Sequence, residues 1–198
     1  MSKQNKTATK VSVAKPSAKT STTSATARSK NTTLAPTLSL SIQYALEVPL
    51  LPRWRVRRWV QRAIDAAQQD GLVDFTRMQV GVRFVGLAEA RQLNAGYRQK
   101  DYATNVLTFE YGVQPDGTAS GDIVLCVPVL KREAKEQRKD FLCHAAHLVI
   151  HGTLHALSYD HIKQRDAKHM ESLETSILAE LGIDNPYLVT ETKRKVLL

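Results

Sequence analysis

The stretch HAAHLVIHGTLHALSYDH, residues 144–161, contains five of the six histidines of the chain. Histidines four apart lie on one face of an α-helix about one turn from each other, so His151 and His155 can bind the same metal ion. His161 follows six residues later and would face elsewhere if the helix continued. The intervening SYD sequence favours a turn that brings the chain back. The spacing therefore predicts a metal site of three imidazoles at the end of a helix.

Three protein ligands leave a fourth coordination position open, which is typical of catalytic rather than structural zinc sites. The same histidine spacing occurs in the metzincin peptidases, whose pattern is HExxHxxGxxH. The glutamate of that pattern is the general base, and Gly152 occupies its position here. The sequence therefore predicts a metal site and argues against peptide hydrolysis.

The remaining histidines are interpreted from their position relative to this triad. If residues 140–157 form one helix, His144 and His147 fall within about 80° of the face that carries the two helical ligands. We interpret His147 as a residue that orients a ligand or faces the substrate. We expect His144 and His169 to pack or to be solvated without a further function.

The composition is that of a soluble protein with one core. The chain has 198 residues, of which 42% are hydrophobic, and this length is enough for one domain. No apolar run approaches the roughly 18 residues of a membrane span, so we expect no contact with a membrane. Cys126 and Cys143 lack the spacing of a metal pair, and we expect buried free thiols in a reducing, cytoplasmic compartment.

The formal net charge of +9 is concentrated at the start of the chain. Residues 1–40 contain seven Lys and Arg and no Asp or Glu, which leaves +2 for the rest. Because residues 1–37 are rich in Ser, Thr and Lys and poor in large apolar residues, we predict a disordered basic tail. Such a tail can hold nucleic acid weakly, and a solvated extension or an organelle transit peptide is the alternative. Residues 38–198 are predicted to form a single domain.

Hydrophobic periodicity predicts the secondary structure of this domain. LSLSIQYAL alternates as a half-buried strand does, and DIVLCV is continuous as a fully buried strand is. Strands are predicted at 38–46, 78–85, 105–111 and 122–127, and helices at 53–69, 87–97, 129–138, 140–157 and 166–181. The predicted fold is α+β: a small mixed four-stranded sheet packed with helices, with the metal site at the end of a central helix.

One basic cluster stands out within the domain. The sequence RWRVRRWVQR, residues 53–62, places five arginines around two tryptophans. This pattern suits a surface that follows a phosphate backbone with aromatic support. The solvated face of an amphipathic helix has the same composition, so both interpretations stay open.

Further motifs connect the chain with a known family. They are LNAGYRQKDYATNVLTFEYG at Leu93–Gly112, GDI at Gly121–Ile123, AHLVIHG at 146–152 and LGIDNPY at 181–187. Together with HGTLHALSYDH, these motifs resemble the YbeY family of bacterial rRNA maturation endoribonucleases. The resemblance covers residues 75–190, with the motifs in the same order.

The resemblance implies a zinc-dependent, single-strand-specific endoribonuclease that acts in 16S rRNA 3′-end processing, ribosome maturation and quality control. It implies one zinc ion bound by His151, His155 and His161, and it places the functional arginine of the family at Arg98. The implied partners are single-stranded ribosomal RNA, components of the small ribosomal subunit and a ribosome-assembly GTPase, all in the cytoplasm.

Two positions depart from the family pattern. Ser158 stands where the family usually has glycine, in the turn between the second and third histidine. If this position needs a positive φ, serine costs on the order of 1 kcal/mol there. Ala103 replaces a proline, which loosens the loop near Arg98 without removing a reactive group.

The chemistry of such a site does not require the missing glutamate. Zinc held by three neutral imidazoles lowers the pKa of its bound water to about 7. The transition state at a phosphodiester carries negative charge on non-bridging oxygens, which the forked cation of Arg98 suits. We predict that water or an RNA 2′-hydroxyl attacks phosphorus while Arg98 stabilises the phosphate. His147 or Asp160 can move a proton, although Asp160 can instead support the turn or orient a ligand.

Two rival functions come from other classes. The first is a non-catalytic, metal-stabilised ribosome assembly factor, against which the open coordination position argues. The second is a metal-dependent hydrolase of another substrate, and Gly152 argues against its peptidase form. Loss of folding on chelation would favour the first rival, and an assay on casein tests the second.

Overall fold

The computed structural model describes residues 9–12, 36–160 and 163–187 of the chain. Its strands are β1 (Thr9–Ser12), β2 (Thr37–Tyr44), β3 (Arg77–Val85), β4 (Val106–Val113) and β5 (Thr118–Cys126). Its helices are α1 (Arg53–Asp70), α2 (Leu87–Arg98), α3 (Val127–Glu136), α4 (Phe141–Ala156) and α5 (Gln164–Glu180). The sheet order is β1-β4-β5-β3-β2, with β4 antiparallel to β5 and all other neighbours parallel. The predicted α+β fold with a mixed sheet is confirmed.

The four predicted strands are β2 to β5, and β1 extends the sheet beyond them. Thr9–Ser12 pairs in parallel with Leu107–Glu110 at the edge of the sheet. No strand is predicted there because a four-residue segment has too few residues for a hydrophobic period to be read. The other residues of the predicted tail up to residue 35 lie outside the described residues.

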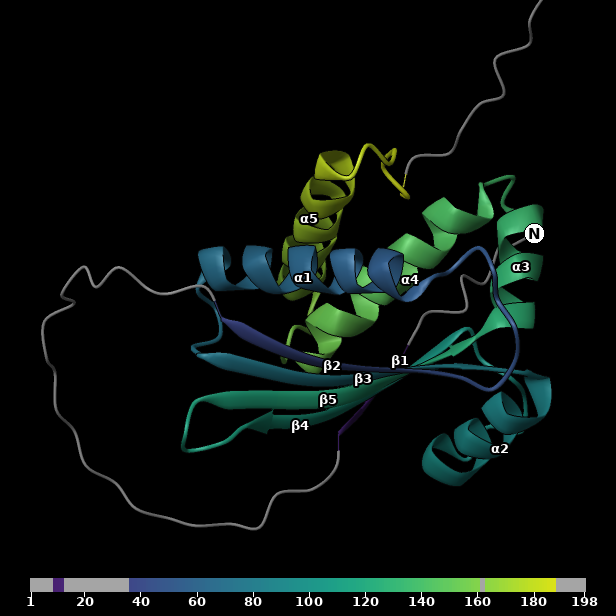
Figure 1. The fold of residues 1–198 in the computed structure, drawn as a ribbon, viewed down its shortest axis with the longest axis horizontal. Helices are drawn as coiled ribbons and strands as arrows, with labels where there is room; N and C mark the ends of the chain where they lie inside the picture. Colours follow the sequence, from purple (N-terminus) through teal and green to yellow (C-terminus); the bar gives the residue numbers. More distant parts are fainter. Residues whose placement is uncertain (1–8, 13–35, 161–162, 188–198) are drawn as a thin grey trace, which may run out of the picture.

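The sheet separates two apolar clusters of unequal size. Helices α1, α4 and α5 cover one face, and α2 lies against the other (Figure 1). Side chains alternate along a strand, so Ile123 and Leu125 of β5 join the larger cluster, whereas Val124 and Cys126 join the smaller one. Among the described residues, no helix is both long and apolar enough to cross a membrane. Cys126 and Cys143 are free thiols, the first buried and the second half-buried.

Glycines allow α4 to pack unusually closely on the sheet. A Cβ at Gly152 would lie 2.7 Å from Ile123 Cγ2 and 3.3 Å from Thr108 Oγ1. A Cβ at Gly121 would lie 2.8 Å from the Cβ of Ala156. Position 152 therefore faces the sheet, not the side of the helix that carries the histidines. A glutamate, as in the peptidase pattern, does not fit there.

Capping residues set both ends of α4. Asp140 caps the N-terminus by accepting hydrogen bonds from the amides of Leu142 at 2.8 Å and Cys143 at 3.1 Å. At the C-terminus, the amide of Tyr159 donates to Leu154 O at 3.1 Å and that of Ser158 to His155 O at 3.1 Å. These two bonds form a Schellman motif with Ser158 in the left-handed region at φ 69°. The predicted turn is confirmed, and position 158 has the positive φ under which serine carries a strain cost.

Candidate metal centre

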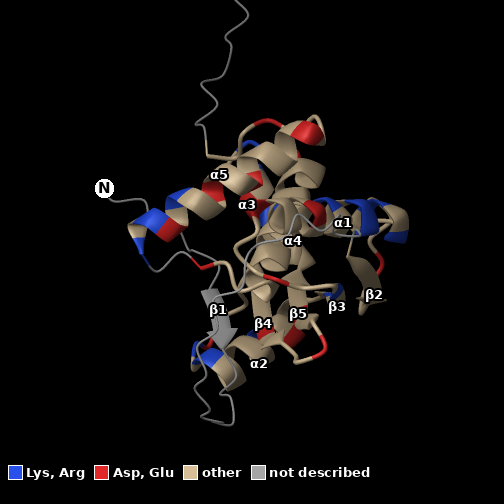
Figure 2. Cartoon of the chain, turned by 90° about the vertical axis from the view of Figure 1, so that its left-hand side faces the viewer, with Lys and Arg blue, Asp and Glu red and all other residues tan. Residues whose placement is uncertain are grey.

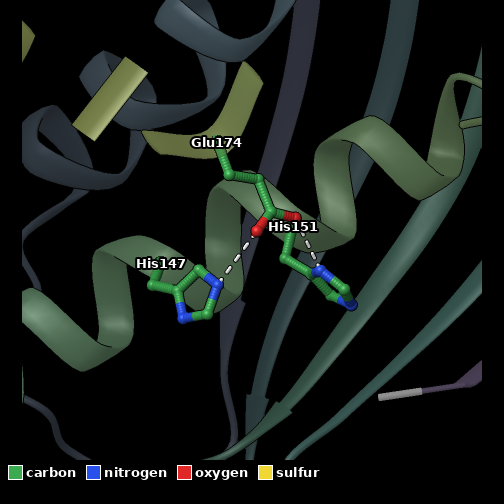
Figure 3. A group of neighbouring side chains, drawn as sticks. All are labelled: His147, His151 and Glu174. Atoms are coloured by element: carbon green, nitrogen blue, oxygen red, sulfur yellow. Dashed lines mark hydrogen bonds and ion pairs between the residues drawn. The ribbon is translucent and has the colours of Figure 1, made fainter. Parts of the chain in front are cut away.

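His151 lies on the side of α4 that meets α5. Its Nδ1 atom is 2.7 Å from Oε1 of Glu174 (Figure 3). An ionised carboxylate only accepts hydrogen bonds, so Nδ1 carries the proton and Nε2 carries the lone pair of the neutral ring. The position of Glu174 thus sets which nitrogen of His151 can bind a metal ion.

Glu174 is a buried carboxylate at the centre of several hydrogen bonds. Its side chain is 1% exposed, and His147 Nε2 lies 3.0 Å from Oε2. Burial acts to raise the pKa of Glu174, but the hydrogen bonds from His147 and His151 outweigh burial and hold this pKa below its ordinary value. The Tyr187 hydroxyl also donates to Oε2. Burial and the charge of Glu174 raise the pKa of Tyr187, so its phenol keeps the donated proton.

His155 lies one turn after His151 and is oriented by the backbone. Its Nδ1 atom donates to the carbonyl oxygen of Tyr159 at 2.8 Å, and a carbonyl oxygen cannot donate in return. The ring centroids of His151 and His155 are 4.4 Å apart, with the ring planes nearly perpendicular. The Nε2 atoms of both rings are buried. Both imidazoles therefore present Nε2 as the ligand atom, which is the donor set that a metal ion with histidine ligands uses.

The third predicted ligand is outside this description. His161 belongs to residues 161–162, which the structure does not describe. The turn after His155 is present as far as Asp160. The structure thus brings together two of the three predicted ligands.

A second set of ligand atoms lies on the other side of His151. One ligand atom each of His147, His151 and Glu174 lie within 4.8 Å of one another, so this group could hold a metal ion. A metal ion there would replace the hydrogen bonds that Glu174 now accepts from the two rings. The Nε2 pair of His151 and His155 keeps those bonds, with the carboxylate behind the ligand as is usual for metal-bound histidine.

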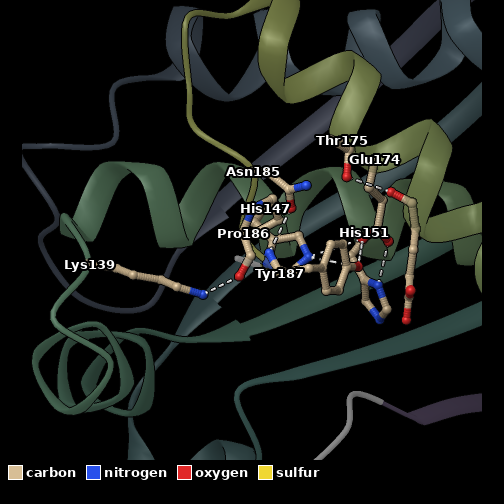
Figure 4. A network of polar contacts seen from close by, with 9 residues as sticks. Lys139, His147, His151, Glu174, Thr175, Asn185, Pro186 and Tyr187 are labelled. Carbon is tan, nitrogen blue, oxygen red and sulfur yellow. Dashed lines mark hydrogen bonds and ion pairs between the residues drawn. The ribbon is translucent and has the colours of Figure 1, made fainter. Parts of the chain in front are cut away.

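The segment after α5 closes the site on one side. Lys139 Nζ donates to Pro186 O at 2.6 Å, and the Tyr187 amide donates to Asn185 Oδ1 at 2.9 Å (Figure 4). The Tyr187 ring meets the His147 ring with centroids 5.4 Å apart. These contacts place the Tyr187 hydroxyl beside Glu174.

Sequence reasoning did not identify Glu174 or Tyr187. Glu174 occupies a buried position in the apolar stripe of α5, between Met170 and Ile177. A charged residue in such a stripe needs a partner, and this was the signal that could have found it. Tyr187 is visible only as the last residue of the LGIDNPY motif.

In the part of the chain that the structure describes, the Arg98 side chain forms no hydrogen bond with His151 or His155. It ends α2, which covers the opposite face of the sheet from α4 (Figure 1). Among the described residues, the Arg98 side chain takes part in no hydrogen bond or ion pair. Burial lowers its pKa and the nearby Tyr102 acts in the opposite direction, yet a guanidinium stays charged at any physiological pH. Arg98 is therefore a half-buried cation that can receive an anion.

The segment after Arg98 is linked to α4 through a small polar network. Asn105 Nδ2 donates to Glu133 Oε2 at 3.0 Å, and His144 Nε2 lies 3.1 Å from the same oxygen. His144 is buried and joins α4 to α3 and to the start of β4. His169 instead lies at the surface, 2.9 Å from Asp70 Oδ2. Both histidines have structural partners and lie outside the His151–His155 pair.

Comparisons with known proteins give a consistent result. A family model described as Endoribonuclease YbeY matches residues 42–182. A protein of Bordetella avium named Endoribonuclease YbeY is 62% identical over 156 residues, which cover 79% of this chain and 97% of that protein. A protein of the same name from Burkholderia lata is 49% identical over 159 residues, 77% of this chain and 87% of that protein.

The fold also has a counterpart among solved structures. The solution structure of a Thermotoga maritima protein covers 73% of this chain and 92% of its own length, with a TM-score of 0.50 and 21% sequence identity. At this identity the likeness concerns the fold alone. The family assignment rests on the family model and on the much closer sequence relatives, and by both of these the chain belongs to the YbeY family.

Proposed function

We propose that this chain is a zinc-dependent, single-strand-specific endoribonuclease that acts in 16S rRNA 3′-end processing, ribosome maturation and quality control. One observation carries the proposal: the rings of His151 and His155 have centroids 4.4 Å apart, and both direct Nδ1 to a hydrogen-bond acceptor, Glu174 or the Tyr159 carbonyl, so that Nε2 is the ligand atom of each ring. Family membership adds the substrate class, since the curated relatives are named endoribonucleases.

The proposed ligands of one zinc ion are His151, His155 and His161. When bound, zinc supplies a Lewis acid and lowers the pKa of a coordinated water. The residues of this chain hold the ligand rings in one tautomer and orientation. Glu174 orients His151, and the Tyr159 carbonyl orients His155.

Arg98 is the proposed phosphate-binding cation. Its guanidinium is half-buried and has five donor hydrogens in a planar fork, which matches the oxygens of a phosphate. Arg98 acts by stabilising negative charge on the non-bridging oxygens while water or a 2′-hydroxyl attacks phosphorus. The proposed surroundings are the cytoplasm, small-subunit components and a ribosome-assembly GTPase, as the family resemblance implies.

Cleavage of a 3′-extended small-subunit rRNA transcript by the purified protein tests the function. The parent protein is compared with His151→Ala, and the metal content of both is measured. His169→Ala is the matched control, because it removes a histidine whose partner is Asp70 and not the metal centre. Cleavage that disappears together with the metal in His151→Ala, and persists in His169→Ala, supports the proposal.

A zinc-loaded parent that does not cut the transcript, even on ribosomes, overturns the endoribonuclease proposal and favours a metal-stabilised assembly factor. Chelation separates the same two functions. For the enzyme, cleavage is lost before the fold melts, whereas for the assembly factor unfolding is the first effect.

The two candidate ligand sets are distinguished by a pair of variants. His155→Ala removes the metal if the Nε2 pair binds it, and His147→Ala then retains most of it. The reverse result assigns the metal to His147, His151 and Glu174. The metal content of the folded variants shows which ligand set binds the metal, and this measurement does not depend on activity.

A further inference from the structure

The first half of α1 has one face that the core does not use. The buried side chains of this helix lie along one side and include Val56, Val60 and Ile64. With a period of 3.6 residues, Trp54 and Arg58 lie on the opposite side of the helix from the buried residues, and Arg57 lies at the edge of the buried side. The structure agrees: Trp54 is 61% exposed, and both arginines are exposed.

Most of the arginines in this helix already have a partner, and two do not. Arg53 Nη1 donates to Ile42 O at 2.6 Å, and Arg55 Nη1 donates to Leu50 O at 2.6 Å. Arg62 lies 3.8 Å from Glu180. Among the described residues, the side chains of Arg57 and Arg58 take part in no hydrogen bond or ion pair. Blue segments, which mark Lys and Arg, recur along α1 in Figure 2.

The two tryptophans of the helix have opposite environments. Trp59 is 5% exposed and packs in the core, so core packing accounts for a tryptophan at this position. Trp54 is exposed, and the Arg55 guanidinium lies 5.0 Å from its ring centroid. Because the Leu50 carbonyl holds that guanidinium, the indole has a fixed neighbour on one side. Trp54 is thus a large, supported aromatic surface in water, beside two unpaired cations.

We propose that this α1 surface, formed by Trp54, Arg55, Arg57, Arg58 and Arg62, binds a single-stranded stretch of RNA outside the cleavage centre. Arg57 and Arg58 contact successive phosphates, and a base stacks on Trp54. The choice of RNA as the polyanion rests on the proposed function. The combination of a cationic surface and an aromatic platform suits a single strand, since every base has a face for stacking.

An anionic membrane is the main competing partner for a basic helix with an exposed tryptophan. Helices that lie in a membrane surface insert a whole apolar face. The apolar face of α1 is already buried against the sheet and α4, and within Arg53–Asp70 Trp54 is the single large apolar side chain that is exposed. The charge and shape of the α1 surface therefore favour RNA.

Trp54 fluorescence provides the test, on the metal-loaded protein and with the signal recorded immediately after each addition of RNA. Polyuridine is titrated into the full chain, and Trp54→Phe identifies which tryptophan responds. We expect quenching that Trp54→Phe removes, and an affinity about five- to tenfold weaker in Trp54→Ala. Affinity falls as the salt concentration rises, and a plot of log affinity against log salt has a negative slope. In Arg57→Gln/Arg58→Gln, loss of two phosphate contacts should make this slope less steep by about 1.4.

Lys131→Gln/Lys135→Gln is the matched control, with the same change of charge at exposed positions of α3. A smaller loss of affinity in this control than in the arginine variant supports a local contact. Equal losses show that net charge alone attracts RNA, and they overturn the proposal. The proposal also fails if Trp54 does not respond to polyuridine, or responds more strongly to phosphatidylglycerol vesicles. Because cleavage is not measured, failure here is distinct from failure of the endoribonuclease proposal.

Discussion

Glu174 Oε1 lies 2.7 Å from His151 Nδ1, although the two residues come from different helices. The contact gives the buried carboxylate a partner and gives the imidazole a defined tautomer. It also explains why a glutamate lies in the apolar stripe of α5. The relationship makes α5 part of the candidate metal centre.

Replacing Glu174 with glutamine tests this role. Glu174→Gln keeps the size of the side chain but removes the charge that holds the proton on His151 Nδ1. We expect metal affinity to fall about 10- to 100-fold, as for other residues that orient a histidine ligand. Competition with a chromogenic chelator measures the change. Glu171→Gln, an exposed position on the same helix, is the control, and equal affinities in both variants would contradict the orienting role.

Gly152 is predicted to be required for stability, not for chemistry. In Gly152→Ala, the new methyl group meets Ile123 Cγ2 at 2.7 Å, so α4 and β5 must separate. The strain exceeds the gain in helix propensity, and we expect a net loss of about 1–2 kcal/mol in the free energy of unfolding. Urea unfolding measures it.

Gly96→Ala is the control for this substitution. Gly96 lies in α2, and a Cβ there would meet nothing within 4 Å. Alanine should therefore stabilise that helix by about 0.5–1 kcal/mol. A Gly152→Ala protein as stable as Gly96→Ala would show that α4 does not need its close approach to the sheet.

Helix α4 and the turn after it were predictable because both depend on local sequence. The four-residue spacing of His151 and His155 defines a helical face, and the SYD sequence defines where the helix stops. Glu174 was not predicted, because its contact with His151 depends on how two helices pack. Hydrophobic periodicity predicts single helices and strands but not contacts between them. A glutamate at an apolar position of the pattern indicates only that some partner exists.

The same limit applies to Gly152 and β1. The sequence shows that a peptidase glutamate is absent, but only the packing of α4 on β4 and β5 shows that no larger side chain fits. For β1, the pairing partner in β4 is far away in the sequence, and four residues carry too little pattern.

Ser158 is predicted to hold a strained conformation. Its φ of 69° favours glycine, while its hydroxyl donates a hydrogen bond to Glu110. Ser158→Ala and Ser158→Gly both lose this bond, and only the glycine variant relieves the backbone. We expect Ser158→Gly to be more stable than Ser158→Ala by about 1 kcal/mol in thermal or urea unfolding. Equal stability of the two variants would mean that the turn imposes no strain.

Asp70 is predicted to link stability to pH through α1 and α5. Its carboxylate accepts hydrogen bonds from Tyr159 at 2.7 Å and His169 at 2.9 Å. Burial acts to raise the pKa of Asp70, but these bonds outweigh it and hold the pKa below the ordinary value of 3.8. The ionised form therefore stabilises the fold above the unfolded-state pKa, and this contribution is lost as pH falls through the folded-state pKa.

Asp70→Asn should lower the free energy of unfolding near pH 7 by up to about 1 kcal/mol, a modest effect for a residue near the surface. The difference from the parent should shrink as the pH falls below 3.8 and through the lower folded-state pKa, because the parent carboxyl is then protonated as well. Urea unfolding at pH 7 and along this acidic range measures it. Asp74→Asn removes an exposed carboxylate four residues away and serves as the control. A difference that is constant with pH would contradict the linkage.

Arg98→Ala is predicted to separate catalysis from metal binding. Because Arg98 lies across the sheet from α4 and has no bond to either histidine, its loss should leave the metal content and stability unchanged. Removing a donor that stabilises the transition state typically costs about 100- to 1000-fold in rate, and we expect a loss of this size in transcript cleavage. Arg98→Lys keeps the charge without the fork and should recover only part of the rate. Lys100→Ala removes a neighbouring exposed charge and should cut at the parent rate; if Arg98→Ala does so too, Arg98 takes no part in the reaction.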